Sequence, residues 1–178
     1  MSTLLELKQL TLNYKNYNTS VEVIKGIDLK INSSEKVAVV GKSGSGKTSL
    51  IMLMAGLEQP TSGEIIFDQQ LISTLNEDQL ADIRKRKIGI VFQSFYLIPN
   101  YTALENVSLI LEINSIDNSK QKAEDLLIQF GLKDRLNHFP TQLSGGEQQR
   151  VAIARSMAVN PKLILACLLY TSPSPRDL

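Results

Sequence analysis

Residues 37–57 read VAVVGKSGSGKTSLIMLMAGL, and this stretch decides the fold. With Lys36 before it, Val37–Val40 is a continuous apolar run rich in β-branched residues, which is typical of a strand buried on both faces. A glycine-rich turn follows at once, and the next residues have helical spacing that stops at Gly56. A buried strand, a turn and a helix in this order predict the start of an α/β unit.

The turn, Gly41–Thr48, reads GKSGSGKT and fits the pattern G-x-x-x-x-G-K-[ST] between a strand and a helix. Its glycines let the backbone bend so that successive N–H groups point at anionic oxygens, and the helix adds the positive end of its dipole. Lys47 suits the β- and γ-phosphates and the Thr48 hydroxyl suits Mg²⁺. The expected phosphate contacts are Gly41, Lys42, Ser43, Gly44, Ser45, Gly46, Lys47, Thr48 and Ser49.

Strands and helices alternate along most of the chain. Further strands are expected at Leu4–Tyr14, in two short pieces around Gly26, and at Gly63–Phe67, Ile88–Phe92 and Lys162–Ala166. A polar helix is expected over Asn76–Lys87, and a purely helical block occupies residues from about 94 to 160. The prediction is an α/β fold with a mostly parallel sheet, an N-terminal antiparallel β part and an inserted helical subdomain. Its neighbouring parallel strands should be Val37–Val40, Ile88–Val91 and Leu163–Ala166.

Composition limits the alternatives. The 178 residues carry a net charge of +1, so no strong field favours nucleic acid, and the 43% hydrophobic content is that of a globular protein. No apolar run is long enough to span a bilayer, and the N-terminus does not resemble a signal peptide. The single cysteine, Cys167, excludes a disulfide framework and indicates a reducing cytosol.

A second motif, Leu143–Arg150, reads LSGGEQQR. Ser144 and Glu147 have capping-box spacing, as do Thr102 and Glu105 earlier in the chain. Gly145 and Gly146 expose backbone N–H groups at the helix start, which makes a second potential anion site. The alternative for these residues alone is an ordinary capped helix.

LSGGEQQR resembles the signature motif of ATP-binding-cassette (ABC) ATPases. With GKSGSGKT upstream and VFQS between the two motifs, the chain resembles the nucleotide-binding domain of this family over Leu4–Ala166. The closest resemblance is to the subgroup that powers lipoprotein release and macrolide export. The resemblance implies a P-loop NTPase core that binds ATP and Mg²⁺ and hydrolyses ATP for a transporter. It also implies a cytoplasmic protein on the inner membrane, and a homodimer in which one copy completes the other's nucleotide site. The residues acting in trans would be Ser144, Gly145, Gly146 and Glu147.

The resemblance assigns further roles. Gln93 would contact Mg²⁺ and the attacking water, with a polar residue ending a strand as the alternative. The Gln93–Asn106 region would meet the membrane permease through Phe95, Tyr96 and Leu97, although core packing could also explain this apolar loop. Tyr14 would stack on adenine, which contributes about 1–3 kcal/mol in related sites. Tyr17 lies close by, and a tyrosine facing water is the alternative.

Two features are expected to carry no chemistry. His138, the only histidine, precedes the signature, whereas the family's switch histidine lies well after the acidic motif, so we expect a structural or surface role. The run Arg84–Lys87 ends a polar helix and should be a solvated face rather than a nucleic-acid site.

The chain departs from the family after Ala166. Family members continue with the Asp and Glu of the Walker B motif, which support Mg²⁺ and polarise water, but here Cys167 and Leu168 stand in their places. Neither side chain suits hard Mg²⁺. Residues 167–177, CLLYTSPSPRD, match an in-frame translation of a transposon-type sequencing adapter. We therefore interpret residues 1–166 as a truncated cassette with a helical subdomain at about 94–160, and residues 167–178 as an artefactual tail.

Two other functions remain open at this point. One is an ABC-type ATPase that signals across the membrane in cell division, and the other is a soluble relative that acts in repair or translation. The transported substrate, the permease and the direction of transport are not readable from the residues. The chain as written is expected to be inactive in hydrolysis.

Overall fold

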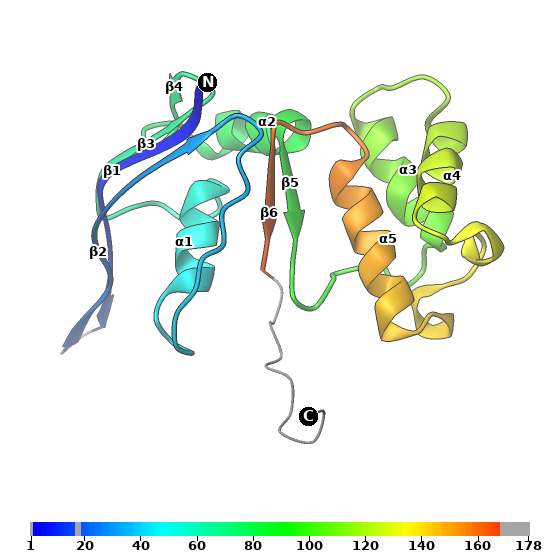
Figure 1. Ribbon diagram of the computed structural model, residues 1–178, viewed down its shortest axis with the longest axis horizontal. Coiled ribbons are helices and arrows are strands. Elements are labelled where there is room, and N and C mark those ends of the chain that lie inside the picture. The colour runs from blue at the N-terminus through cyan, green and yellow to red at the C-terminus, as the bar shows by residue number, and fades with distance from the viewer. Residues whose placement is uncertain (1, 17–18, 168–178) are drawn as a thin grey trace. The chain divides into compact units, whose positions relative to one another are not determined.

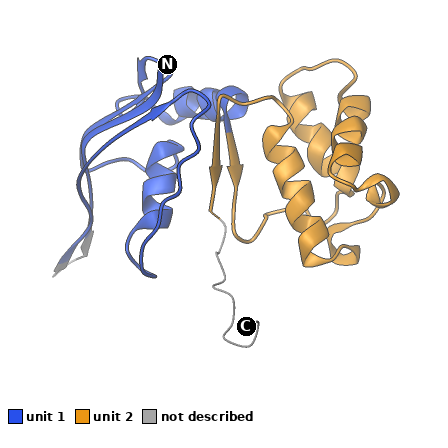
Figure 2. Cartoon of the chain, viewed as in Figure 1, with its two compact units in different colours: residues 1–88 blue, residues 89–178 orange. Residues whose placement is uncertain are grey.

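The computed structural model describes residues 2–16 and 19–167 and divides the chain into two compact units, Met1–Ile88 and Gly89–Leu178 (Figure 2). Strands and helices are mixed in both, which confirms the expected α/β class. Across the described residues, every helix is too short or too polar to cross a membrane.

The first unit combines an antiparallel sheet with two helices (Figure 1). The sheet has the order β2-β1-β3-β4, which confirms the expected antiparallel part. The elements of this unit are β1 (Thr3–Asn16), β2 (Thr19–Asn32), α1 (Lys47–Met54), β3 (Ser62–Phe67), β4 (Gln70–Leu71) and α2 (Glu77–Lys87).

Strand β1 supplies the core of this unit through four leucines, Leu5, Leu7, Leu10 and Leu12, each at most 3% exposed. Leu5 and Leu7 have odd numbers, whereas Leu10 and Leu12 have even numbers, so the alternation of buried residues shifts by one along the strand. The shift occurs at an irregularity at Gln9, whose φ is 45°. A β-bulge of this kind moves the alternation by one residue and keeps the following side chains on the buried face.

The expectation of two short strands around Gly26 is wrong, because β2 is one continuous strand. The backbone N–H of Gln9 donates to Asp28 Oδ1 at 2.8 Å, and Gly26 takes a φ of 69° beside the Gln9 side chain. Glycine adopts this left-handed conformation without steric cost. Strand β2 therefore accommodates the irregularity at Gln9, and its pairing with β1 continues on both sides of this point.

The expectation that Val37–Val40 forms a strand buried on both faces is also wrong for this structure. These residues have no strand assignment, and Val37, Val39 and Val40 are 45%, 36% and 87% exposed. A central strand exists only when its backbone groups are paired on both edges. The described residues provide no strand pairing for this run, so its β-branched composition alone does not make it a strand.

Helix α2 ends in the basic run Arg84–Lys87, which is less solvated than expected. The Arg84 guanidinium donates to the Gly56 carbonyl oxygen at 2.6 Å, and its side chain is only 16% exposed. Lys87 pairs with Asp68 at 2.8 Å, and Arg86 pairs with Asp82 at 3.0 Å. These contacts make the run part of the fold of this unit.

In the second unit a short parallel sheet, β5-β6, lies beside the helices, and both arrowheads point the same way (Figure 1). Two of the three expected parallel neighbours are thus confirmed. A Cβ at Gly89 of β5 would clash with the Ser156 carbonyl oxygen of α5, so strand and helix approach closely. The elements are β5 (Ile88–Val91), α3 (Ala103–Ile113), α4 (Ser119–Gln129), α5 (Gly145–Met157), β6 (Leu163–Ala166), and the 3₁₀ turns η1 (Lys133–Arg135) and η2 (Pro140–Gln142).

Helices α3, α4 and α5 pack together into a helical lobe, which confirms the expected helical block (Figure 1). The buried core of this lobe consists of Ala103, Val107, Leu111, Ala123, Leu127, Leu132, Leu143, Val151 and Ala154. Thr102 and Glu105 form the expected capping box at the start of α3. The His138 carbonyl oxygen accepts from the Ala103 N–H at 2.9 Å, so the backbone at this residue helps to fix the start of α3.

Candidate functional site

The start of α1 is shaped by glycines. Gly46 is its N-cap with a φ of 86°, and no side chain caps the helix. Gly44 also has a left-handed φ, 76°, and a Cβ there would meet no atom within 4 Å. Residues 33–45 are exposed. An uncapped helix start behind a glycine-rich turn presents N–H donors and the positive dipole end to an anion.

Lys47 lies over this turn. Its Nζ donates to the carbonyl oxygens of Gly41 at 2.8 Å and Lys42 at 2.7 Å. These bonds hold the ammonium group beside the loop that the pattern assigns to phosphate. The next residue, Thr48, is exposed, so its hydroxyl oxygen suits a hard cation such as Mg²⁺. The residues present therefore fit a polyphosphate with its metal ion.

Tyr14 is 47% exposed near the end of β1, and its hydroxyl donates to Glu58 Oε2 at 3.2 Å. Its ring is thus accessible to a base, and Glu58 fixes the hydroxyl end. The competing residue, Tyr17, lies outside the described residues.

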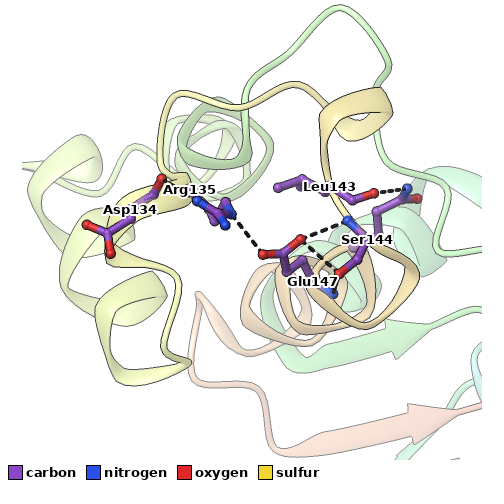
Figure 3. Close-up of polar contacts among 6 residues, drawn as sticks. Asp134, Arg135, Leu143, Ser144 and Glu147 are labelled. Carbon is purple, nitrogen blue, oxygen red and sulfur yellow. Dashed lines mark hydrogen bonds and ion pairs between the residues drawn. The ribbon is translucent and has the colours of Figure 1, made fainter.

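The start of α5 is built differently. The Ser144 N–H and hydroxyl both donate to Glu147 Oε2 at 2.8 Å, and the Glu147 N–H donates back to Ser144 Oγ at 3.3 Å (Figure 3). This confirms the expected capping box. A Cβ at Gly145 would meet nothing within 4 Å, and one at Gly146 only Arg150 at 3.8 Å. The backbone of both glycines is therefore open to an approaching group.

Glu147 is held in its ionised form. The Ser144 N–H and hydroxyl, followed by Arg135, lower the pKa of its carboxyl to about 2. Arg135 Nε donates to Glu147 Oε1 at 2.8 Å, so each carboxylate oxygen has its own donors (Figure 3). Sequence reasoning missed Arg135, because it lies 12 residues away in η1 and only the fold brings it to the helix start.

Gln93 is exposed and lies in a tight turn after β5. The Phe95 N–H donates to the Phe92 carbonyl oxygen at 3.1 Å, which closes a turn around Gln93 and Ser94. Tyr96 is 66% exposed, whereas Leu97 packs on the core of the helical lobe. Of the expected permease contacts, Tyr96 is thus the accessible one.

At the end of β6 the Cys167 N–H donates to the Val91 carbonyl oxygen at 2.8 Å, so sheet pairing continues to this residue. Cys167 is therefore a strand-end residue, and it stands where the resemblance leads one to expect an acidic residue. Leu168 and the rest of the expected artefactual tail lie outside the described residues.

The ABC transporter family model matches residues 24–166, and the chain belongs to this family. LolD, the lipoprotein-releasing system ATP-binding protein of Geobacter metallireducens, is 46% identical over 93% of this chain and 75% of its own length. The macrolide export ATP-binding/permease protein MacB of Pasteurella multocida is 44% identical over 92% of this chain and 25% of its own length.

A solved structure, the dimeric post-hydrolysis state of the ATP-binding cassette MJ0796 bound to ADP and Pi, has the same fold. It matches with a TM-score of 0.86 and 42% identity, over 92% of this chain and 73% of that one. The family and subgroup resemblances drawn from the motifs are confirmed, and with them the P-loop NTPase class and membership in an ATP-hydrolysing transporter family.

Proposed function

We propose that this chain is the ATP-binding subunit of a transporter that couples ATP hydrolysis to lipoprotein release or to export. The observation that carries the proposal is the presence of two helix starts with adjacent glycines, at α1 and α5, which would each form one half of a cassette nucleotide site. The relatives named for lipoprotein release and macrolide export support the substrate classes. The subunit would act on the cytoplasmic face of the inner membrane.

The nucleotide would bind at Gly41–Ser49, with Lys47 at the β- and γ-phosphates and Tyr14 on the adenine. Bound Mg²⁺ would neutralise phosphate charge, and its protein ligands would be Thr48 and Gln93. The exposure of residues Thr48 and Gln93 and the lack of a side-chain cap at α1 support these roles.

A second copy would supply Ser144, Gly145, Gly146 and Glu147 to the same nucleotide. The dimeric state of the related cassette supports a homodimer. The open space over Gly145 and Gly146 supports their approach to a phosphate group. No role for nucleic acid is proposed.

The permease would dock on the Gln93–Asn106 region. Tyr96 is the most exposed large apolar side chain in this region, which supports it as a contact. A photo-cross-linking residue in place of Tyr96 should label a lipoprotein-type or macrolide-type permease in co-expressing cells, and the same residue at the exposed Lys133 should not.

The proposed cassette comprises residues 1–166, with its helical subdomain at about 94–160, and residues 167–178 do not belong to it. The end of the family match at residue 166 supports this boundary. Because Cys167 and Leu168 replace an Asp and a Glu, the chain as written should bind ATP without hydrolysing it at a useful rate.

The direct test is binding of a fluorescent ATP analogue to the purified chain, followed by sizing with and without Mg-ATP. We expect saturable binding and a nucleotide-dependent dimer. No binding by a chain whose circular dichroism shows a folded state would contradict the proposal.

A further inference from the structure

Arg155, in the last turn of α5, binds a loop that lies 60 residues earlier in the chain. Its Nη2 donates to the Phe95 carbonyl oxygen at 2.6 Å and its Nη1 to the Tyr96 carbonyl oxygen at 2.8 Å. Burial lowers the pKa of Arg155, which nevertheless stays charged. A charged guanidinium with two separate acceptors makes strong and directional hydrogen bonds.

The two carbonyls belong to residues in an unfavourable conformation. Phe95 and Tyr96 have φ values of 57° and 45°, and two consecutive non-glycine residues in the left-handed region are costly. Such a conformation persists only when surrounding contacts hold it. Besides Arg155, these contacts include the Phe92 ring, which meets Tyr96 edge-on at 5.2 Å between centroids.

The strained pair is continuous with the turn that carries Gln93. Phe95 closes that turn through its N–H, and the Tyr96 N–H donates to the Ser94 carbonyl oxygen at 2.6 Å. The Tyr96 N–H···Ser94 bond spans the backbone torsions of Phe95, so a change of conformation at Phe95 would open this bond and loosen the turn that carries Gln93. The direction of the Gln93 side chain therefore depends on the contacts that fix residues 95 and 96.

The far end of the loop is held independently. Asn106 is fully buried, accepts from the Ile98 N–H at 2.8 Å, and donates to the carbonyl oxygens of Ile98, Tyr101 and Thr102. Because Asn106 fixes residues 98–102, the segment whose conformation depends on Arg155 is confined to residues 93–97.

We propose that Arg155 is a positioning residue that clamps the Phe95–Tyr96 backbone and thereby sets the orientation of Gln93. The proposal rests on the role given to Gln93 in the proposed function.

Amide hydrogen exchange tests the clamp. Arg155→Met keeps an apolar stem but removes both donors, and we expect exchange at Phe95 and Tyr96 to rise about tenfold or more. In Arg155→Lys the ammonium group can donate to one of the two carbonyl oxygens at a time, so exchange at Phe95 and Tyr96 should rise less. Arg150→Met, an exposed arginine on the same helix, is the matched control and should change neither amide.

Amides of Val107 and Val151 in the lobe core report whether a variant is folded. If the Met variant loses that protection, the Lys variant decides the question, and its loop exchange should rise while its core stays protected. Unchanged exchange at Phe95 and Tyr96 in a folded variant would overturn the clamp.

Nucleotide affinity tests the link to Gln93. Arg155→Met should weaken binding of ATP in the presence of Mg²⁺ and leave binding in EDTA unchanged, as should Gln93→Ala. The double variant should be no weaker than Gln93→Ala alone. One contrary result is faster exchange in the loop of Arg155→Met while Gln93→Ala binds ATP in Mg²⁺ as tightly as the parent chain. That result would contradict the role of Gln93 in the proposed function. If Gln93→Ala weakened ATP binding in Mg²⁺ but Arg155→Met did not, the positioning role of Arg155 would be wrong.

Discussion

The starts of α1 and α5 are both exposed helix termini with adjacent glycines, yet they are stabilised in opposite ways. At α1 a glycine is the N-cap and no side chain caps the helix. At α5 the Ser144–Glu147 capping box and Arg135 supply side-chain partners, and a carboxylate already lies at the positive end of the helix dipole. The first terminus has no compensation from a capping side chain, whereas the second is largely compensated from within the chain.

This difference predicts a division of labour. ATP affinity in the monomer should reside almost entirely at α1, and α5 should contribute only when a second copy presents it to an ATP that is already bound. The loss of stability at low pH should instead depend on the start of α5. Of these two helix starts, only that of α5 is capped with the help of an ionised side chain.

The largest expected effect concerns hydrolysis, which neither terminus provides alone. Replacing residues 167–178 with the corresponding, longer C-terminal part of the Geobacter LolD should raise steady-state phosphate release. Loss of a general base costs about 10²–10⁴-fold, and the family resemblance predicts an acidic pair at positions 167 and 168 of the replaced segment. Equal phosphate release by the two purified chains would contradict the roles assigned to those positions.

The next effect tests the division of affinity. Lys47→Ala removes the ammonium group and should weaken Mg-ATP binding about 100-fold, since a charged hydrogen bond contributes about 1.5–3 kcal/mol. Ser144→Ala should change monomer affinity by less than about twofold. Titration with a fluorescent ATP analogue below the dimerisation concentration measures both. If Ser144→Ala lowered the ATP affinity of the monomer as much as Lys47→Ala does, the proposed division of affinity between α1 and α5 would be wrong.

The smallest effect concerns pH. The folded-state pKa of Glu147 lies near 2, below the ordinary value of 4.5, so its cap stabilises the fold fully above about pH 4.5 and loses this contribution as pH falls towards 2. The melting temperature of Glu147→Gln should therefore lie below that of the parent chain at pH 6 and converge with it at about pH 2.

Glu105 provides an internal comparison for this prediction. Its pKa is lowered by the Thr102 N–H and hydroxyl in a matching capping box, and within the described part of the chain no arginine forms an ion pair with it. Glu105→Gln should show the same sign of pH dependence with a smaller amplitude. A pH-independent difference between parent and Glu147→Gln would show that the carboxylate charge is not what stabilises this terminus.

The features that the sequence predicted well are those whose partners lie within a few residues. Both capping boxes, at Thr102–Glu105 and Ser144–Glu147, involve residues three apart and are present as expected. The strand character of Val37–Val40 depends on backbone pairing with strands remote in the chain, so composition could not establish it.

Long-range polar contacts account for what was missed at the candidate site. Arg135 reaches Glu147 across 12 residues, and Arg155 reaches the carbonyls of Phe95 and Tyr96 across about 60. In the sequence both arginines look like ordinary charged residues near helix ends. The Gln9 bulge was missed for a similar reason, since its Asp28 partner lies on the next strand.

The most direct test of the central claim, that the two helix starts are halves of one nucleotide site, is a mixing experiment. Lys47→Ala damages the α1 half, and Ser144→Arg obstructs the α5 half while sparing monomer binding. A heterodimer of the two contains one intact composite site. Light scattering after size exclusion with Mg-ATP should show monomers for each variant alone and a dimer for the equimolar mixture. Dimerisation of Ser144→Arg alone, or a mixture that stays as monomeric as its components while the parent chain dimerises, would contradict the account.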